Sequence, residues 1–308
     1  MSKDRALLIV NPIRSARAVK LLTRIEDTLV KLGVHCDLKF TERKGHGMEL
    51  AAQGLEQGYK TIVAVGGDGT VNEVVNTVVG TETAVFSIPL GAGNDFLRSL
   101  GIRTWKEACG VLAQGGFAQI DAGLAEYRDD NGRLQRRYYA VLADVGFGSE
   151  VVRNTPRRLR HALGGNLGYV VSLYRTAMRG QARARQMRMR VDGELRYDER
   201  ILLVEALNGM YAGGGLKVAP KAKLNDGLLD VFVARDMHWL KIWALFPRIY
   251  RGTHIEHEKA GYFHAKEVEV EAEESIRTSV DGEMIGYTPV RFSIVPGALK
   301  VRCPPGMG

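Results

Sequence analysis

Residues 61–79 read Thr-Ile-Val-Ala-Val-Gly-Gly-Asp-Gly-Thr-Val-Asn-Glu-Val-Val-Asn-Thr-Val-Val. The first five residues are β-branched or apolar, which predicts a buried strand over 61–65. Three glycines then follow within four residues. Because they lack side chains, they allow positive φ angles and close approach of a ligand to the backbone. The valines at 71, 74, 75 and 78 have the spacing of one helix face. The stretch therefore predicts a strand, a glycine turn and a helix.

This order of elements is a phosphate-binding geometry, because the N–H groups and positive dipole of a helix N-terminus point at an anion. Asp68 places a carboxylate where the anion would bind, which is compatible with a phosphate accompanied by Mg²⁺ or by a donating hydroxyl group. We expect a nucleotide site with Asp68 as its reactive or metal-facing member; an ordinary βα turn is the alternative. The chain has no P-loop sequence, and no Gly-x-Gly-x-x-Gly motif follows a strand.

The composition is that of a soluble globular protein. The 308 residues are 45% hydrophobic and 25% charged, and the length suits two domains. No apolar run reaches the ~18–20 residues of a membrane span, and the N-terminus does not read as a signal peptide. The cysteines at 36, 109 and 303 match no zinc or redox spacing, which favours packed thiols in a reducing cytoplasm.

The first part of the chain alternates strands with helices, which predicts a parallel, doubly wound sheet. Strands are expected at residues 6–10, 34–40, 61–65 and 84–88. Helices are expected around residues 21–32, 47–58, 71–78 and 105–112. Ligands bind such sheets at the carboxyl ends of the strands. Asn11, Thr41, the first glycine turn and a second glycine turn at residues 91–95 all lie at those ends.

After residue 121 the pattern changes to short strands with turns, which predicts an antiparallel sandwich or barrel. Strands are expected at residues 138–145, 187–191, 201–206, 228–234, 268–272, 290–295 and 299–303, and helices around residues 167–178 and 239–251. The expected domains are residues 1–122, to which 296–308 can add a strand, and residues 123–295. A cleft between the two domains is the expected active site.

Several polar motifs are candidates for chemistry. Asp226, in Asn225-Asp226-Gly227, fits either a hairpin turn or a hard-cation site with main-chain carbonyl groups. Asp281-Gly282 is also a turn signal, and Glu283 beside it is a candidate proton acceptor if the fold brings it near Asp68. His254, His257 and Glu258 match no zinc motif, and we interpret them as surface residues of a loop.

The order of these motifs resembles the diacylglycerol kinase catalytic-domain family, in particular its soluble bacterial lipid kinases related to sphingosine kinases. The resemblance covers nearly the whole chain. It is carried by residues 65–74, 89–96, 120–123, 225–231 and 281–283. It implies an α/β N-terminal domain with a parallel sheet like that of NAD kinase and 6-phosphofructokinase. It also implies a C-terminal antiparallel β-sandwich, with inserted helices, that takes the lipid substrate.

The resemblance further implies ATP-dependent transfer of the γ-phosphoryl group to a lipid hydroxyl group, diacylglycerol-like, with Glu283 as general base and Asp68 positioning nucleotide and Mg²⁺. The implied Mg²⁺ ligands are the carbonyl groups of Lys223 and Leu228 and the carboxylate of Asp226. The implied nucleotide contacts are Asn11, Thr41, Gly66, Gly67, Asp68, Gly69, Thr70, Val71, Asn72, Gly91, Ala92, Gly93 and Asn94. Ala92 departs from the threonine that is usual in the family, which removes one hydroxyl contact to the nucleotide.

The net charge of +8 is concentrated, because ten arginines and no acidic residue lie between Val151 and Val191. Such a patch favours an anionic partner, either a membrane or a nucleic acid. A lipid kinase must dock on a bilayer, so we expect a cytoplasmic, peripherally membrane-associated protein. The arginines expected at the anionic surface are Arg157, Arg158, Arg160, Arg183 and Arg185.

Two alternatives stay open from the sequence: a kinase for a soluble substrate such as NAD, and a nucleotide-dependent regulator that binds nucleic acid. The second is less favoured, because the arginine-rich stretch has few interleaved aromatics and no DNA-binding motif. The sequence leaves the oligomeric state open and is compatible with a homodimer.

Overall fold

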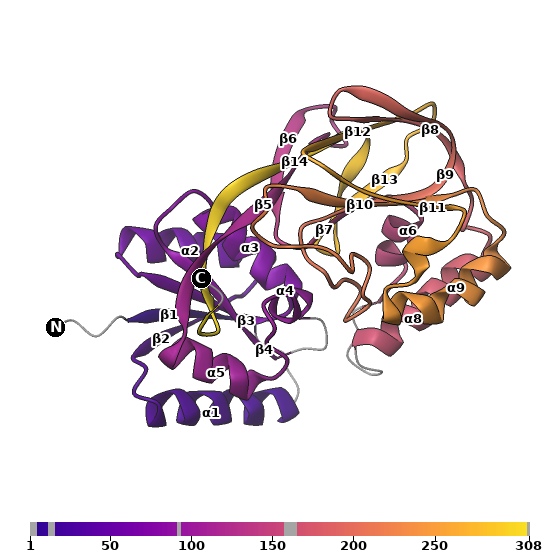
Figure 1. Ribbon diagram of the computed structural model, residues 1–308. Coiled ribbons are helices and arrows are strands. Elements are labelled where there is room, and N and C mark those ends of the chain that lie inside the picture. Colours follow the sequence, from indigo (N-terminus) through magenta and orange to yellow (C-terminus); the bar gives the residue numbers. More distant parts are fainter. Residues whose placement is uncertain (1–4, 12–15, 91–93, 157–164, 307–308) are drawn as a thin grey trace. The chain divides into compact units, whose positions relative to one another are not determined.

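The computed structural model describes residues 5–11, 16–90, 94–156 and 165–306, and the chain divides into two compact units (Figure 1). The first unit comprises Met1–Ile120 together with Gly297–Gly308, and the second comprises Asp121–Pro296. The chain therefore leaves the first unit and returns to it at its end. The boundary after Ile120 lies two residues before the one expected at residue 122.

The first unit alternates strands and helices. Its elements are β1 (Ala6–Val10), α1 (Ala16–Lys31), β2 (Cys36–Phe40), α2 (His46–Glu56), β3 (Thr61–Gly66), α3 (Asp68–Val78), β4 (Ala84–Pro89), α4 (Asp95–Ser99) and α5 (Trp105–Gln114). Every residue of β1, β3 and β4 is buried, as expected of apolar strands covered on both faces. The valine face predicted for α3 is also buried, so the pattern of the opening stretch is confirmed.

The sheet of the first unit has the order β2-β1-β3-β4, and the end of β14 (Glu283–Cys303) lies beside β4. All of these neighbours run parallel. Helices cover both faces: α1 contacts α5 below the sheet in Figure 1, and α2 contacts α3 above it. The carboxyl ends of β1 to β4 therefore meet at one edge, which is where a sheet of this kind binds ligands.

The second unit consists mainly of strands. Its elements are the greater part of β5 (Gly116–Arg128), then β6 (Leu134–Tyr139), β7 (Leu142–Gly146), α6 (Phe147–Arg153), α8 (Gly165–Met178), β8 (Arg185–Val191), β9 (Glu194–Leu207), β10 (Leu229–Arg235), α9 (Trp239–Arg251), the 3₁₀ turn η1 (His254–Glu256), β11 (Ala260–Ala265), β12 (Glu267–Ala272), β13 (Arg277–Val280) and the first part of β14. Helices α6, α8 and α9 lie together beside these strands (Figure 1).

The strands of the second unit pair antiparallel in a closed circuit. It runs from β9 to β8, β12, β14, β13 and β7, and then back to β9. One hydrophobic core fills the space among these strands, with Tyr139 and Phe292 as its largest fully buried side chains. A second core joins the outer strands to the helices and includes Phe147, Leu173 and Phe246.

Three predicted details differ from the structure. The strand expected at 138–145 is broken between β6 and β7, because the N–H groups of Ala140, Val141 and Leu142 donate to the Asp281 carboxylate. The strands expected at 290–295 and 299–303 are parts of the single strand β14. Strands β5, β11 and β13 were not predicted, because their sequences lack the strict apolar alternation that identifies a strand.

Candidate functional site

The predicted nucleotide-binding residues that the structure describes follow neighbouring strands of the first sheet. The Asn11 N–H donates to the Val65 carbonyl over 3.0 Å, and the Thr41 N–H donates to the Val10 carbonyl over 2.9 Å. The Asn11 side-chain amide also donates to the Thr70 hydroxyl over 3.3 Å. The sheet therefore brings the ends of β1, β2 and β3 together. Gly91, Ala92 and Gly93 lie outside the described residues.

The turn between β3 and α3 depends on its glycines. A Cβ atom at Gly66 would lie 2.7 Å from the Thr70 hydroxyl oxygen, so a larger residue would push Thr70 away. A Cβ atom at Gly67 would meet no described atom within 4 Å, so the backbone there borders open space. The N–H groups of Thr70 and Val71 donate to the Gly67 carbonyl, which starts α3 at Asp68. The N–H groups ahead of that first turn have no partner within a helix, and they favour an anion.

Asp68 links the start of α3 to the start of α4. Its Oδ2 atom accepts a hydrogen bond from the Asn94 N–H, and its Oδ1 atom accepts one from the Asp95 N–H, each over 3.2 Å. Asn94 has a φ angle of +79°, a left-handed conformation that asparagine tolerates better than most residues. The Asp68 carboxylate thus holds the start of α4 against the start of α3.

Glu73 forms a second link of the same kind, which the sequence reasoning missed. Its carboxylate accepts hydrogen bonds from the Gly45 N–H over 2.8 Å and from the Gly47 N–H over 2.9 Å. A Cβ atom at Gly47 would lie 2.4 Å from that carboxylate, so the contact requires glycine. The Gly-x-Gly spacing before a helix was the available signal. Carboxylates from α3 therefore occupy donors at the starts of α2 and α4.

The side chains of Val71 and Asn72 are buried, so neither side chain can contact a nucleotide. Val71 is 3% exposed and Asn72 is fully buried. The side-chain oxygen and the main-chain carbonyl of Asn72 both accept hydrogen bonds from the Asn76 amide. Thr41 is also buried, so its hydroxyl group borders the strand end rather than the surface.

In the second unit, Asp281 and Gly282 form the turn between β13 and β14. Both have positive φ angles, 45° and 77°, as in the two-residue turns that join hairpin strands. The Asp281 carboxylate accepts hydrogen bonds from three successive N–H groups, of Ala140, Val141 and Leu142, over 2.9–3.1 Å. Glu283, the candidate base, is half-buried at the first position of β14 and pairs with Val280. Its backbone is therefore fixed by a turn with its own anchor.

The loop that carries the predicted Mg²⁺ ligands is held by Asp121. The Asp121 carboxylate accepts a hydrogen bond from the Gly227 N–H over 2.7 Å, and its own N–H donates to the Leu224 carbonyl over 2.7 Å. Asp226 is exposed, and one of its oxygens accepts from the Leu228 N–H over 3.2 Å. One exposed carboxylate with main-chain carbonyls nearby is a donor set that suits a hard cation retaining several waters. Among the described residues, no cluster of three or more His, Cys, Asp or Glu side chains could hold a metal ion.

His254 was expected on the surface, and that prediction is wrong. Its side chain is 2% exposed, its Nε2 atom lies 3.0 Å from the Val218 carbonyl oxygen, and its ring packs against Phe232. Burial lowers the pKa of His254 to about 4. The residue therefore acts as a neutral part of the core beside η1.

An apolar cavity of about 90 Å³ lies in the second core, and its lining includes Phe147, Leu173 and Ile242. Glu205 is the one carboxylic acid among the described residues of its lining. Burial, together with the nearby Asp144 carboxylate, raises the pKa of Glu205 to about 8. Burial also raises the pKa of Asp144 to about 6, although hydrogen bonds from the Ser149 and Ser279 hydroxyl groups, each 2.5 Å long, act in the opposite direction.

Glu205→Gln is expected to stabilise the fold more at pH 8 than at pH 5. The folded chain keeps the Glu205 proton up to about pH 8, whereas an unfolded glutamate loses it near pH ~4.3. Stability is therefore lost as the pH rises through this window, and a neutral glutamine avoids the loss, on the order of 5 kcal/mol at pH 8. Urea unfolding at both pH values measures the difference. Glu194→Gln, at an exposed position of the same strand, is the matched control; equal shifts at both pH values would contradict the raised pKa.

The predicted membrane-surface arginines divide into two groups. Arg157, Arg158 and Arg160 lie outside the described residues. Arg183 is exposed, and Arg185 forms an ion pair of 2.8 Å with Glu274. The stretch contains no acidic residue in sequence, but the fold brings acidic residues to it from elsewhere, and Arg188 is likewise paired, with Asp198. In the part of the chain that is described, no helix is both long and apolar enough to cross a membrane.

Two family descriptions match most of the chain. Residues 5–125 match the Diacylglycerol kinase catalytic domain, and residues 143–303 match the YegS C-terminal NAD kinase beta sandwich-like domain. A Staphylococcus saprophyticus protein named Diacylglycerol kinase is 30% identical over 98% of this chain and 96% of its own length. The chain belongs to the diacylglycerol kinase catalytic-domain family.

Other members of the diacylglycerol kinase catalytic-domain family agree over the whole length. A Pseudomonas aeruginosa protein named "Probable lipid kinase YegS-like" is 31% identical over 99% of this chain and 96% of its own length. A solved Bacillus anthracis structure, whose assignment as a diacylglycerol kinase is provisional, is 25% identical, with a TM-score of 0.80 and complete coverage of both chains. Family membership thus extends across both units.

Proposed function

We propose that this protein is an ATP-dependent lipid kinase that transfers the γ-phosphoryl group to a hydroxyl group of a diacylglycerol-like lipid. The observation that supports the proposal most strongly is the Asp68 carboxylate, which joins the start of α3 to Asn94 and Asp95 beside the carboxyl ends of parallel strands. Phosphoryl transfer depends mainly on positioning and charge neutralisation. The Asp68 contacts would supply the positioning, and the N–H groups at the start of α3 would supply part of the neutralisation. The names of full-length relatives support the lipid as acceptor.

The nucleotide would bind at the edge formed by Asn11, Gly67, Asp68 and Thr70. Glu73 and Asp68 already occupy donors at the starts of α2 and α4, so the start of α3 is the helix end best suited to the phosphates. Open space beside Gly67 would let a phosphate approach the backbone. Asp68 would position the nucleotide by fixing Asn94 and Asp95 at the start of α4.

The acceptor would be handled by the second unit. Glu283 would take the proton of the lipid hydroxyl group, and the anchored turn at Asp281 would keep its backbone in place. Mg²⁺ would be held by Asp226 and the carbonyl groups of Lys223 and Leu228, and it would supply positive charge that neutralises phosphate oxygens. The apolar cavity lined by Phe147 and Leu173 suits a hydrocarbon chain.

Transfer of radiolabelled γ-phosphate from ATP to a panel of acceptors tests this function. The panel comprises diacylglycerol, monoacylglycerol, a sphingoid base and phosphatidylglycerol in mixed micelles, with NAD as the soluble acceptor. We expect label in the organic phase with at least one lipid and none on NAD. Label on NAD alone would identify a kinase for a soluble substrate. If folded protein, shown by cooperative unfolding, transferred phosphate to none of the lipids, the proposal would be overturned.

A further inference from the structure

The second unit contains a polar cavity of about 440 Å³ that the proposed phosphoryl transfer does not use. It lies at the end of α8, beside α6, the start of β8 and the β13–β14 hairpin. Five arginines line it: Arg153, Arg179, Arg183, Arg185 and Arg277. Among the described residues of the lining, Glu150 is the one acidic side chain. The cavity therefore gathers positive charge around a hollow.

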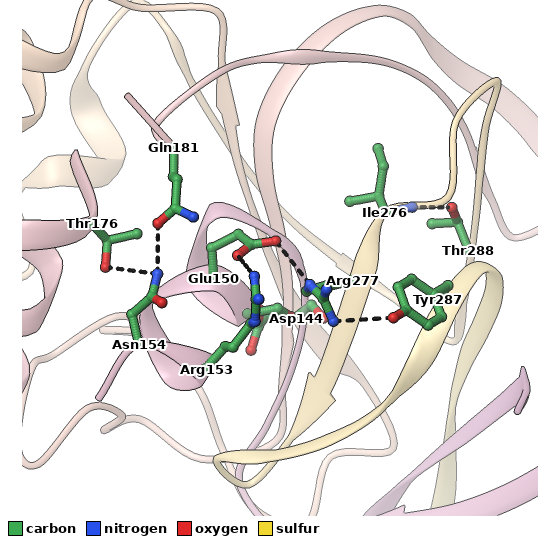
Figure 2. Close-up of polar contacts among 11 residues, drawn as sticks. Asp144, Glu150, Arg153, Asn154, Thr176, Gln181, Ile276, Arg277, Tyr287 and Thr288 are labelled. Carbon is green, nitrogen blue, oxygen red and sulfur yellow. Dashed lines mark hydrogen bonds and ion pairs between the residues drawn. The ribbon is translucent and has the colours of Figure 1, made fainter. Parts of the chain in front are cut away.

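Two of these arginines share one carboxylate (Figure 2). The Glu150 carboxylate lies 3.4 Å from Arg153 and 3.2 Å from Arg277. Arg277 also donates a hydrogen bond of 3.1 Å to the Tyr287 hydroxyl group, and its guanidinium carbon lies 5.3 Å from the centre of the Tyr287 ring. A single carboxylate neutralises only one of the two guanidinium groups, although it orients both.

The remaining three arginines differ in how their charge is compensated. Arg185 pairs with Glu274, which does not line the cavity. Arg179 and Arg183 are exposed, and neither forms an ion pair with any carboxylate in the described ranges of the chain. Arg183 lies beside Gly180, where a Cβ atom would be 3.6 Å from its Nη2 atom. The turn from α8 to β8 therefore presents two uncompensated guanidinium groups to the cavity.

Hydrogen bonds brace the walls of the cavity. The Asn154 amide on one side donates to Gln181 over 2.6 Å and to the Thr176 hydroxyl group over 3.4 Å, which joins the end of α6 to the turn after α8 (Figure 2). On the other side, the Ile276 N–H donates to the Thr288 hydroxyl group over 3.1 Å. The arginine-bearing segments are thus fixed before any ligand arrives, which reduces the entropy cost of binding.

We infer that this cavity binds a phosphomonoester group. Converging guanidinium groups repel one another, and a phosphate dianion relieves that repulsion with paired hydrogen bonds that arginine geometry favours. A volume of about 440 Å³ suits a small ligand or one lipid headgroup. The charges converge on one hollow, whereas a single-stranded nucleic acid needs a longer groove with stacking aromatics. The phosphomonoester can be free in solution or be the headgroup of a membrane lipid; binding of either kind does not rest on the proposed kinase activity.

Calorimetric titration of the full chain with inorganic phosphate is the first test. Arg179→Gln/Arg183→Gln removes the two uncompensated cavity arginines. Arg188→Gln/Arg190→Gln removes the same charge from exposed positions of β8 outside the lining and is the matched control. We expect the cavity variant to weaken phosphate binding at least about tenfold, because charge-assisted hydrogen bonds are lost, and the control to change it less than about twofold. Equal weakening in both variants, or no phosphate binding by the unmodified protein, would overturn the inference.

Vesicle flotation then separates the two sources of the phosphomonoester. Phosphatidylcholine vesicles carry either phosphatidate, whose headgroup is a phosphomonoester, or enough phosphatidylglycerol, a phosphodiester, to give the same surface potential. A membrane source predicts preferential flotation with phosphatidate that Arg179→Gln/Arg183→Gln loses and Arg188→Gln/Arg190→Gln keeps. A soluble source predicts equal flotation with both vesicles together with the loss of phosphate affinity in the cavity variant. Circular dichroism and thermal unfolding confirm that both variants fold.

Discussion

Glu283→Gln is expected to lower kcat for lipid phosphorylation by about 10²–10⁴-fold, which is the contribution of a positioned general base. Glutamine keeps the size of the side chain and can still form hydrogen bonds, but it cannot accept the proton of the lipid hydroxyl group. The turn before it should stay intact, because Asp281 supplies the carboxylate that holds the turn. The KM for ATP should change little, since Glu283 serves the acceptor. Steady-state transfer of labelled γ-phosphate measures both quantities.

The matched control for this prediction is Glu271→Gln. Glu271 is exposed on β12, so the same charge is removed from another strand of the same unit. The control should retain the rate and the melting temperature of the unmodified protein. Full activity in Glu283→Gln would remove Glu283 from the role of base. A parallel fall in melting temperature would instead attribute the lost rate to a damaged fold.

Asp68→Asn is expected to lower kcat/KM for ATP by at least about 10²-fold, because it loosens the start of α4 at Asn94 and Asp95. Both carboxylate oxygens accept hydrogen bonds from backbone N–H groups. An asparagine offers one oxygen, and its NH₂ group would face the second N–H. A donor left without an acceptor costs about 1–3 kcal/mol, and every 1.4 kcal/mol corresponds to about tenfold in affinity. Displacement of Asn94 and Asp95 adds to that loss by altering the proposed nucleotide site.

ATP-induced protection against thermal unfolding, measured together with the transfer rate, shows whether Asp68→Asn impairs nucleotide binding or the transfer step. The variant should lose both the protection and the rate, whereas Glu283→Gln should lose the rate alone. Asp27→Asn, at an exposed position of α1 in the same unit, provides the matched control and should keep both. Unchanged protection by ATP in Asp68→Asn would show that Asp68 does not shape the nucleotide site.

Much of the fold follows from patterns that are local in sequence. The valine face of α3 and the continuous apolar residues of β1, β3 and β4 predict their elements directly, because burial on one helix face or on both sheet faces leaves a clear period. Positions of glycine were equally informative where the backbone needs them, as at Gly66 and Gly282. These signals depend on neighbours within about ten residues.

The details that the sequence did not predict depend on partners far along the chain. The break between β6 and β7 is made by Asp281. Its carboxylate accepts hydrogen bonds from N–H groups that lie 139–141 residues away along the chain. The carboxylate of Glu73 reaches Gly45, 28 residues earlier. His254 was interpreted as a surface residue of a loop, but Val218 and Phe232 pack around it. The short-range spacing of residues in the sequence does not reveal contacts between residues that are far apart along the chain.

The arginine-rich stretch illustrates the same limit for the candidate sites. Its excess of positive charge is evident in the sequence. The fold pairs some of the described arginines with carboxylates outside the stretch and leaves Arg179 and Arg183 unpaired beside a cavity. The partner acids Glu150, Asp198 and Glu274 lie outside the stretch. The charge of the stretch predicted an anionic partner, and the arrangement of the arginines in the fold shows which of them could contact it.

The strand β14 runs without interruption from Glu283 in the second unit to Cys303 in the first, where Val301 pairs with Val85 of β4. The side chains of Leu299, Val301 and Cys303 are at most 1% exposed, so this last strand is part of the core that the first 120 residues begin. A ribosome releases the N-terminal residues long before it makes this strand. The β4 edge must therefore stay unpaired while the second unit is synthesised, and an unpaired edge is where chains aggregate. The first unit therefore reaches its native sheet only after residues 299–303 have been made.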